Sequence, residues 1–134
     1  MTARQIGIIE HPHPIIVGSG IAGLSTALGL DGSTIVTASF IGSGSSPLAQ
    51  GGIAAAIGPN DEPGVHAADT LTVGAGIVDP KVASMITTVA ASRIDWLTNL
   101  GARFDKESSG DTQLGREAGH SASRIVHAGG DATG

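Results

Sequence analysis

The feature that most constrains this chain is a glycine-rich stretch near its start. Residues 15–30 read IIVGSGIAGLSTALGL, an apolar run followed by glycines in G-x-G-x-x-G spacing and then by helix-compatible residues. Between a strand and a helix, this spacing is typical of a turn that binds a dinucleotide pyrophosphate. Gly18 permits the tight turn, Gly20 lets the backbone approach the phosphates, and Gly23 lets the helix pack closely. The alternative interpretation is a glycine-rich turn between a core strand and a core helix.

The residues around this turn predict the first half of a parallel α/β unit. We expect a strand at residues 15–17, a helix at 22–30 and a second, parallel strand at 34–37. Dinucleotide-binding folds commonly place an acidic residue about 20 residues past the glycines, where it holds a ribose hydroxyl. No Asp or Glu occurs between Asp31 and Asp61, and Asp31 lies too early. The sequence therefore predicts that hydroxyls or backbone groups hold the ribose.

Composition limits the alternatives. The 134 residues suffice for one domain, and the 40% of apolar residues include only two Phe, one Trp and no Tyr, so Ala, Ile, Val and Leu must form the core. The absence of Cys excludes disulfides and thiolate metal sites. A net charge of −5 without a basic cluster argues against nucleic acid and anionic membranes as partners. His11 and His13 are assigned to a surface loop, and we expect no metal site and a cytoplasmic location.

A second glycine motif follows a loop rich in Gly and Ser. Residues 41–48 resemble a flexible linker by composition. They run directly into AQGGIAAAI at residues 49–57, however, which is an apolar segment headed by two glycines. A linker does not normally continue into such a segment. We therefore interpret the loop at residues 41–48 as a second backbone cradle that packs against the ligand.

The remaining residues predict two helices, with polar turns at 58–64 and 105–112. A short helix at residues 65–73 carries His66 and Asp69, and a longer helix is capped by Asp79, begins at Pro80 and ends at Gly101. Its predicted core face has Ile94 at its edge. The residues of that face are Val82, Met85, Ile86, Val89, Ala90, Trp96, Leu97 and Leu100.

Four stretches in order resemble the L-aspartate oxidase family, within the succinate dehydrogenase and fumarate reductase flavoprotein superfamily. They are VGSGIAGLSTAL at 17–28, AQGGIAAA at 49–56, HAADTLTVGAG at 66–76 with Asp79, and REAGHSASRIVHAGGDATG at 116–134. The resemblance implies an α/β, Rossmann-like FAD-binding domain that is incomplete, residues 1–134 being its N-terminal part with the start of an inserted capping segment. Because family members continue well past residue 134, we expect this chain alone to be inactive.

The resemblance also implies which residues hold FAD. Succinate dehydrogenases commonly carry a histidine, bonded covalently to the flavin, at the position of Ser45. A hydroxyl cannot form that linkage, so non-covalent FAD is expected. The residues assigned to FAD binding are Gly18, Ser19, Gly20, Ile21, Ala22 and Gly23 in the first turn, and Ser45, Ser46, Leu48, Ala49, Gln50, Gly51 and Gly52 in the second motif.

Two polar residues are assigned to substrate binding by the same resemblance. Aspartate oxidases carry a glutamate at the position of Glu117, and a carboxylate there can pair with the ammonium group that distinguishes L-aspartate from succinate. The alternative for Glu117 is a surface ion pair with Arg116 or Arg124. His120 is expected to orient the substrate or Glu117. For Arg116, Arg124 and His127 a structural contact and a catalytic role both remain open, so no catalytic residue is assigned.

The implied activity is oxidation of L-aspartate to iminoaspartate, with electrons passed to oxygen or fumarate, in the first step towards quinolinate and NAD. The next enzyme of quinolinate synthesis is a possible partner. Ala38 and Ala118 depart from the family pattern, which has Lys and Gly at these positions, and they place FAD affinity in question. Two alternatives are a fumarate reductase or succinate dehydrogenase flavoprotein fragment and a non-catalytic nucleotide-binding remnant.

Overall fold

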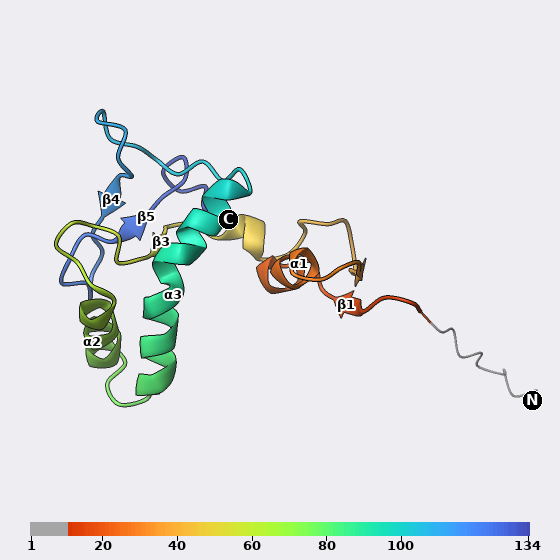
Figure 1. The fold of residues 1–134 in the computed structure, drawn as a ribbon, viewed down its shortest axis with the longest axis horizontal. Coiled ribbons are helices and arrows are strands. Elements are labelled where there is room, and N and C mark those ends of the chain that lie inside the picture. Colours follow the sequence, from red (N-terminus) through yellow and green to blue (C-terminus); the bar gives the residue numbers. More distant parts are fainter. Residues whose placement is uncertain (1–10) are drawn as a thin grey trace, which may run out of the picture. The chain divides into compact units, whose positions relative to one another are not determined.

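The computed structural model describes residues 11–134, and the chain divides into two compact units between Leu48 and Ala49. Figure 1 shows the elements of both units in chain order. The sequence also predicts a lead-in without a helix at residues 1–14, because it contains Pro12 and Pro14, and residues 1–10 of it lie outside the described residues. No helix among the described residues is both long and apolar enough to cross a membrane.

The first unit is a short parallel β-α-β arrangement. Strand β1 (Ile15–Val17) leads into helix α1 (Ile21–Leu28), and strand β2 (Thr34–Val36) pairs with β1 in parallel. The pairing sets Ile15 opposite Thr34 and Val17 opposite Val36. Both strands and their parallel pairing were predicted, whereas α1 begins one residue earlier and ends two residues earlier than expected. A 3₁₀ turn, η1 (Ser46–Leu48), closes the unit.

The second unit combines a small antiparallel sheet with two helices. Strands β3 (Ile53–Ala54), β4 (Leu114–Gly115) and β5 (Ile125–Val126) form a sheet in the order β3-β5-β4. Helix α2 (Pro63–Val73) packs along helix α3 (Pro80–Asn99) (Figure 1). Helix α2 begins two residues before the predicted start because proline is well tolerated at the first helical position.

Both ends of α3 form as predicted. The Asp79 carboxylate accepts hydrogen bonds from the backbone N–H groups of Lys81 and Val82 at 2.8 and 3.3 Å. Pro80 occupies the first turn, where a missing N–H costs little. After the C-cap Leu100, Gly101 takes a φ of +103°, which is a left-handed conformation suited to glycine.

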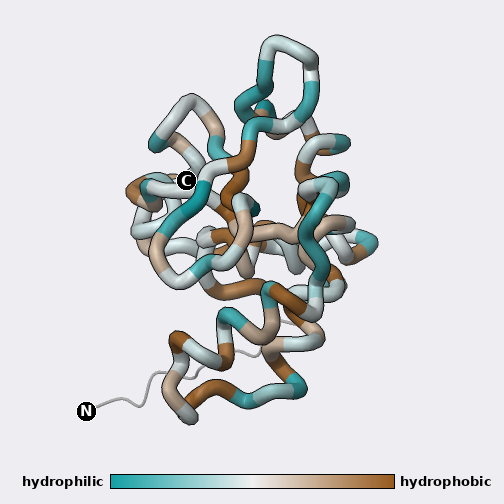
Figure 2. Tube along the Cα trace, turned by 90° about the vertical axis from the view of Figure 1, so that its left-hand side faces the viewer, coloured by the Kyte–Doolittle hydropathy of each residue, from teal (hydrophilic) through white to brown (hydrophobic). Residues whose placement is uncertain are grey.

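The predicted core face of α3 is wrong in the first half of the helix, whereas Ala90 in the predicted face does pack against the core. Val82, Met85, Ile86 and Val89 are exposed, and the buried residues are Ala83, Thr87 and Ile94. Figure 2 shows apolar segments at many places along the trace, so apolar character alone does not identify the buried face. The small side chains of Ala83 and Thr87 permit close packing. The Thr87 hydroxyl is satisfied because it donates to the Ala83 carbonyl at 3.0 Å.

The core lies where α3 meets the sheet of the second unit. Ala55, Ile94 and Val126 form a buried cluster, and Trp96, predicted as core, is only half-buried. The partly buried residues around the cluster are Ile53, Ile57, Ala90, Phe104 and Leu114. Ile94, expected at the edge of the apolar face, is therefore central. All buried apolar side chains among residues 11–134 belong to this unit.

Candidate functional site

The first glycine turn has the geometry that its spacing predicts. Gly18 has a φ of +106°, and its N–H donates to the Val36 carbonyl at 2.8 Å. A side chain at Gly23 would begin 2.1 Å from the Gly18 carbonyl oxygen, so the close approach of α1 to this turn requires glycine. Gly20 is the N-cap of α1. The start of α1 therefore offers backbone N–H groups and the positive end of the helix dipole to an anion.

Ser46 joins the start of the second glycine motif to this turn. Its Oγ accepts a hydrogen bond from the Ile21 N–H at 3.2 Å, and a side chain at Gly20 would begin 3.4 Å from the same oxygen. Ser45 and Leu48 lie on either side of Ser46 in the chain, Leu48 at the end of η1. The first unit thus brings some of the residues assigned to FAD together, and the bare backbone at Gly20 suits a pyrophosphate.

Hydroxyl groups occupy the end of β2, where an acidic residue is usual. Ser19 is buried, and its Oγ donates to Oγ1 of Thr37 at 3.1 Å. Thr37 directly follows β2. It remains a prediction that hydroxyl or backbone groups bind the ribose. The hydroxyls of Ser19 and Thr37 are candidates for this role because they lie at the end of β2.

The rest of the second glycine motif, residues 49–52, lies in the second unit, where it contacts Thr133 and Gly134. Gly52 needs to be glycine because a side chain there would begin 2.3 Å from Cγ2 of Ile125. Gly51 has a φ of +74°, and its carbonyl accepts a hydrogen bond from the Thr133 hydroxyl. The Gly134 N–H donates to the Ala49 carbonyl at 3.0 Å. Gln50 lies in the same stretch.

Asp105 holds the glycine pair near the end of the chain, a role that the sequence analysis missed. Its carboxylate accepts hydrogen bonds from the N–H groups of Gly129 and Gly130 at 2.7 and 2.9 Å. These bonds hold the pKa of Asp105 below its usual value. Two adjacent glycines, both with positive φ, are a signal for an anion-binding turn. The carboxylate that this turn binds could not be identified from the sequence, because Asp105 lies 24 residues before Gly129.

Glu117 lies beside the second glycine motif with an exposed carboxylate. Its Oε1 is 3.8 Å from the point where a Gly51 side chain would begin and 3.9 Å from Nε2 of His127. The alternative of an ion pair with Arg116 or Arg124 is wrong for this structure. Among the described residues the ion pairs of Arg124 are with aspartates, and Arg116 instead donates from Nε to the His120 carbonyl at 3.0 Å.

Arg124 is a fully buried structural cation. Its Nε and Nη2 donate to the two carboxylate oxygens of Asp61 at 2.7 and 2.8 Å, and its Nη1 donates to Asp69 at 2.6 Å. The bonds to Asp61 are the main cause that raises the pKa of Arg124 above its ordinary value. A structural ion pair was one of the two roles that the sequence left open for this residue.

Asp69 connects α2 to the loop at residues 116–121. Its Oδ2 accepts from the backbone N–H and the hydroxyl of Ser121, each at 2.8 Å, as well as from Arg124. These hydrogen bonds, the backbone bond first, lower the pKa of Asp69 to about 2. The Asp69 carboxylate therefore holds the loop that carries Glu117 and His120.

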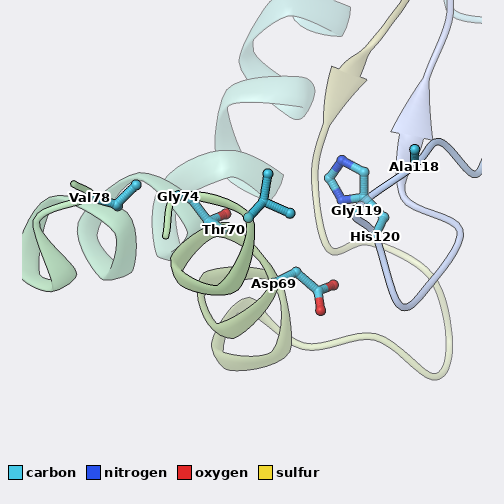
Figure 3. Close-up of a pocket in the computed structure, with 8 residues that line it drawn as sticks. Asp69, Thr70, Gly74, Val78, Ala118, Gly119 and His120 are labelled. Atoms are coloured by element: carbon cyan, nitrogen blue, oxygen red, sulfur yellow. The ribbon is translucent and has the colours of Figure 1, made fainter. Parts of the chain in front are cut away.

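His120 borders an open hollow of about 320 Å³ in the second unit (Figure 3). Asp69 and Thr70 of α2 lie on its other side. The His66 ring lies 5.6 Å from that of His120, and burial lowers the pKa of His66, which favours its neutral form. Within residues 11–134, no three His, Asp or Glu side chains are grouped as metal ligands would be.

A glycine turn that leads from a strand into a helix, with a second strand pairing in parallel, defines a Rossmann-like nucleotide-binding fold. The chain belongs to the FAD binding domain family, whose model matches residues 13–134. This confirms the predicted fold class and the predicted cofactor, FAD. The assignment of individual residues to FAD and substrate stays a prediction.

The curated relatives that match carry a more specific name than the domain family does. The chain is 48% identical over 124 residues to an L-aspartate oxidase from Mesorhizobium japonicum, covering 90% of this chain and 24% of that protein. It is 46% identical over 124 residues to an L-aspartate oxidase from Xylella fastidiosa, with the same coverage of 90% and 24%. The resemblance to this family is confirmed, and the chain spans about a quarter of the length of these curated relatives.

The fold is also that of solved structures. A structure of the Mycobacterium smegmatis Sdh1 complex in the apo form matches with a TM-score of 0.83 at 29% identity, covering 90% of this chain and 22% of that chain. A quinol fumarate reductase from E. coli matches with a TM-score of 0.82 at 20% identity, again over 90% and 22%, which shows the shared fold alone.

Proposed function

We propose that this chain is the N-terminal FAD-binding part of an L-aspartate oxidase, which oxidises L-aspartate to iminoaspartate. The relatives that carry this name support the proposal. The structural observation that carries it is the position of Glu117, whose exposed carboxylate lies beside Gly51 and has no arginine partner among the described residues.

The charge of Glu117 suits the substrate. L-aspartate carries an ammonium group that succinate and fumarate lack. A carboxylate that is already paired with a buried arginine would gain little from binding it, whereas an uncommitted carboxylate can form a charge-assisted hydrogen bond. Among the described residues, the ionic neighbour of Glu117 within 4 Å is the imidazole of His127, whose Nε2 lies 3.9 Å from Oε1. We infer that Glu117 accepts from the substrate ammonium and that His120, three residues on, helps to orient the substrate.

The glycine motifs hold the cofactor in this proposal. Gly18, Gly20 and Gly23 shape the turn that presents the start of α1 to the pyrophosphate, and Ser46 fixes the turn through the Ile21 N–H. Bound FAD would supply the acceptor for the substrate hydride, while the protein supplies position and charge. Ser45 cannot form the covalent histidyl link, so FAD is held non-covalently.

The remaining partners are proposals as well. Oxygen or fumarate would take the electrons, and the next enzyme of quinolinate synthesis would take the product. A role in NAD biosynthesis and a cytoplasmic location follow from the same proposal.

Flavin binding is the first test. The purified chain is loaded with FAD, desalted, scanned for flavin absorbance and then precipitated with acid. We expect a yellow protein whose flavin remains in the supernatant. Flavin that stays in the pellet would contradict non-covalent binding, and a chain that never retains flavin would support the non-catalytic alternative.

Substrate recognition is the second test, made in a chimera of this chain with the remaining part of the Mesorhizobium japonicum relative. Removing one charge-assisted hydrogen bond costs about 1.5–3 kcal/mol, which corresponds to about a tenfold to hundredfold loss. We expect Glu117→Gln to weaken L-aspartate by that factor and to leave succinate nearly unchanged. Glu107→Gln, on an exposed turn, is the matched control. Equal weakening of both ligands would rule out ammonium recognition by Glu117.

A further inference from the structure

The loop between β4 and β5 carries a contact that the proposed function does not use. Nη1 of Arg124 lies 3.3 Å from Nδ1 of His120. Arg124 is the last residue before β5, and its side chain is fully buried, whereas His120 is partly exposed at the hollow shown in Figure 3. A fixed cation therefore touches one ring nitrogen of a residue that faces a hollow.

The guanidinium group decides the chemistry of this contact. Every polar hydrogen of arginine is a donor, and the group has no acceptor. The contact is a hydrogen bond only if Nδ1 of His120 accepts. The ring proton of neutral His120 must then be on Nε2.

Arg124 is well suited to impose this choice because it cannot turn away. Asp61 binds its Nε and Nη2 as a bidentate partner, and Asp69 accepts from Nη1. A planar guanidinium held at two edges keeps its N–H directions fixed. Asp69 also holds Ser121, the neighbour of His120, through two hydrogen bonds. The orientation of the guanidinium and the position of the loop are thus set by the same carboxylate.

We propose that Arg124 is a positioning residue that fixes His120 as the Nε2–H tautomer. The Nε2–H group of neutral His120 is then a donor on the same loop as the acceptor Glu117. A donor of this kind suits the carboxylate of an α-amino acid, since the carboxylate accepts. The assignment of an amino acid as ligand rests on the proposed function, whereas the tautomer of His120 does not.

The tautomer is measured directly on the 134-residue chain. Long-range ¹H–¹⁵N correlation spectra of the imidazoles, recorded where His120 is neutral, distinguish a protonated Nε2 from a protonated Nδ1. We expect His120 to show the Nε2–H pattern. An Nδ1–H pattern, or an equal mixture, would overturn the proposal without any variant being made.

Two matched arginine variants test the cause. Arg124→Met removes the donor that faces Nδ1, so we expect His120 to become a mixture of tautomers. Arg116→Met is the control, because Arg116 donates to the backbone carbonyl of His120 and not to its ring. An unchanged pattern in folded Arg124→Met, or the same change in both variants, would overturn the proposal. If Arg124→Met does not fold, the unmodified chain still decides.

Failure of this proposal is distinguishable from failure of the proposed function. A chain that binds no flavin or L-aspartate but shows Nε2–H at His120 would leave the positioning role intact. A chain that discriminates L-aspartate through Glu117 but shows Nδ1–H at His120 would exclude it.

Discussion

A single carboxylate oxygen of Asp69 accepts three hydrogen bonds that link distant parts of the chain. Its Oδ2 accepts from Arg124 and from both polar hydrogens of Ser121, which is 52 residues away in the chain. Each of these bonds favours the charged carboxylate, so the folded pKa is about 2 against an ordinary value of 3.8. A group whose pKa is depressed on folding stabilises the fold above its unfolded pKa and loses that contribution as pH falls through the folded value.

We therefore predict a distinct acid response for Asp69→Asn. The unmodified chain should lose stability as pH falls from about 4 towards about 2, because Asp69 must be protonated in that window. Asp69→Asn should be less stable near neutral pH and should lose less of its remaining stability in the window. Urea unfolding at a series of pH values, followed by tryptophan fluorescence of Trp96, measures both effects.

Asp95→Asn is the control for this acid response, since Asp95 is an exposed residue of α3. It should reproduce the pH profile of the unmodified chain. A profile for Asp69→Asn that is parallel to the unmodified one across the window would show that the hydrogen bonds of Asp69 do not stabilise the folded chain.

At the scale of elements, the packing of α1 on β1 depends on Gly23. A Cβ there would lie 2.1 Å from the Gly18 carbonyl oxygen, which cannot be relieved by a flexible side chain. We predict that Gly23→Ala destabilises the first unit by about 1–3 kcal/mol, as forced overpacking does. The backbone amide signals of β1 and β2 in NMR spectra report this loss through their exchange with solvent.

Gly29→Ala is the matched control in the same unit. Gly29 has a φ of −89°, and a Cβ there would meet its nearest neighbour at an ordinary 3.6 Å. The alanine should be neutral or stabilising by about 0.4–1 kcal/mol because it restricts the unfolded chain. Equal destabilisation by both alanines would contradict the specific role of Gly23.

Helix α3 shows what a sequence pattern leaves open. The periodicity correctly predicts a long helix, and Asp79, Pro80 and Gly101 correctly predict its ends. It predicts the wrong buried face in the first half of the helix, because a stripe of large apolar residues shows which face can be buried and not which face a neighbour covers. The face that packs is built partly from Ala83 and Thr87, which carry a weak apolar signal.

Two identical substitutions on α3 test this correction. Ile94 is 5% exposed in the core and Ile86 is 56% exposed. Ile94→Ala should cost about 2–5 kcal/mol in unfolding free energy, as core truncations do, whereas Ile86→Ala should cost less than about 1 kcal/mol. Denaturant unfolding of both variants measures the difference. Similar costs at the two positions would mean that the stripe of Val82, Met85, Ile86 and Val89 is buried in solution.

In the candidate site, too, contacts between residues close in sequence were predictable, whereas contacts between residues far apart in sequence were not. Gly18, Gly20 and Gly23 were predictable because their roles depend on neighbours within a single turn. The partners Asp61, Asp69 and Arg124 were not, since the pairs are separated by more than 50 residues and no spacing rule connects them. Glu117 was singled out by resemblance alone, and its position beside Gly51 emerges only when β3 and β4 both pair with β5.

At the scale of the whole molecule, the two units differ in how many buried apolar side chains they contain. Among the described residues, every buried apolar side chain lies in the second unit, and in the first unit Ile15, Val17 and Ile21 are exposed. Apolar burial is the main favourable contribution to folding. The first unit should therefore open at a lower free energy than the second, as weakly packed regions of proteins do.

Hydrogen exchange on the unmodified chain compares the free energies at which the two units open, and it also tests whether FAD binding stabilises the first unit. The Gly18 and Thr34 amides, bonded to Val36 and Pro14, should exchange much faster than the Ala55 amide, bonded to Arg124. Because FAD binds the folded turn and not the open one, FAD at about 100 times its Kd should add about 2.7 kcal/mol and slow exchange in the first unit about 100-fold. Equal exchange in both units without FAD would contradict the marginal packing of the first, and unaltered exchange at saturating FAD would place the cofactor elsewhere than at the Gly18–Gly23 turn.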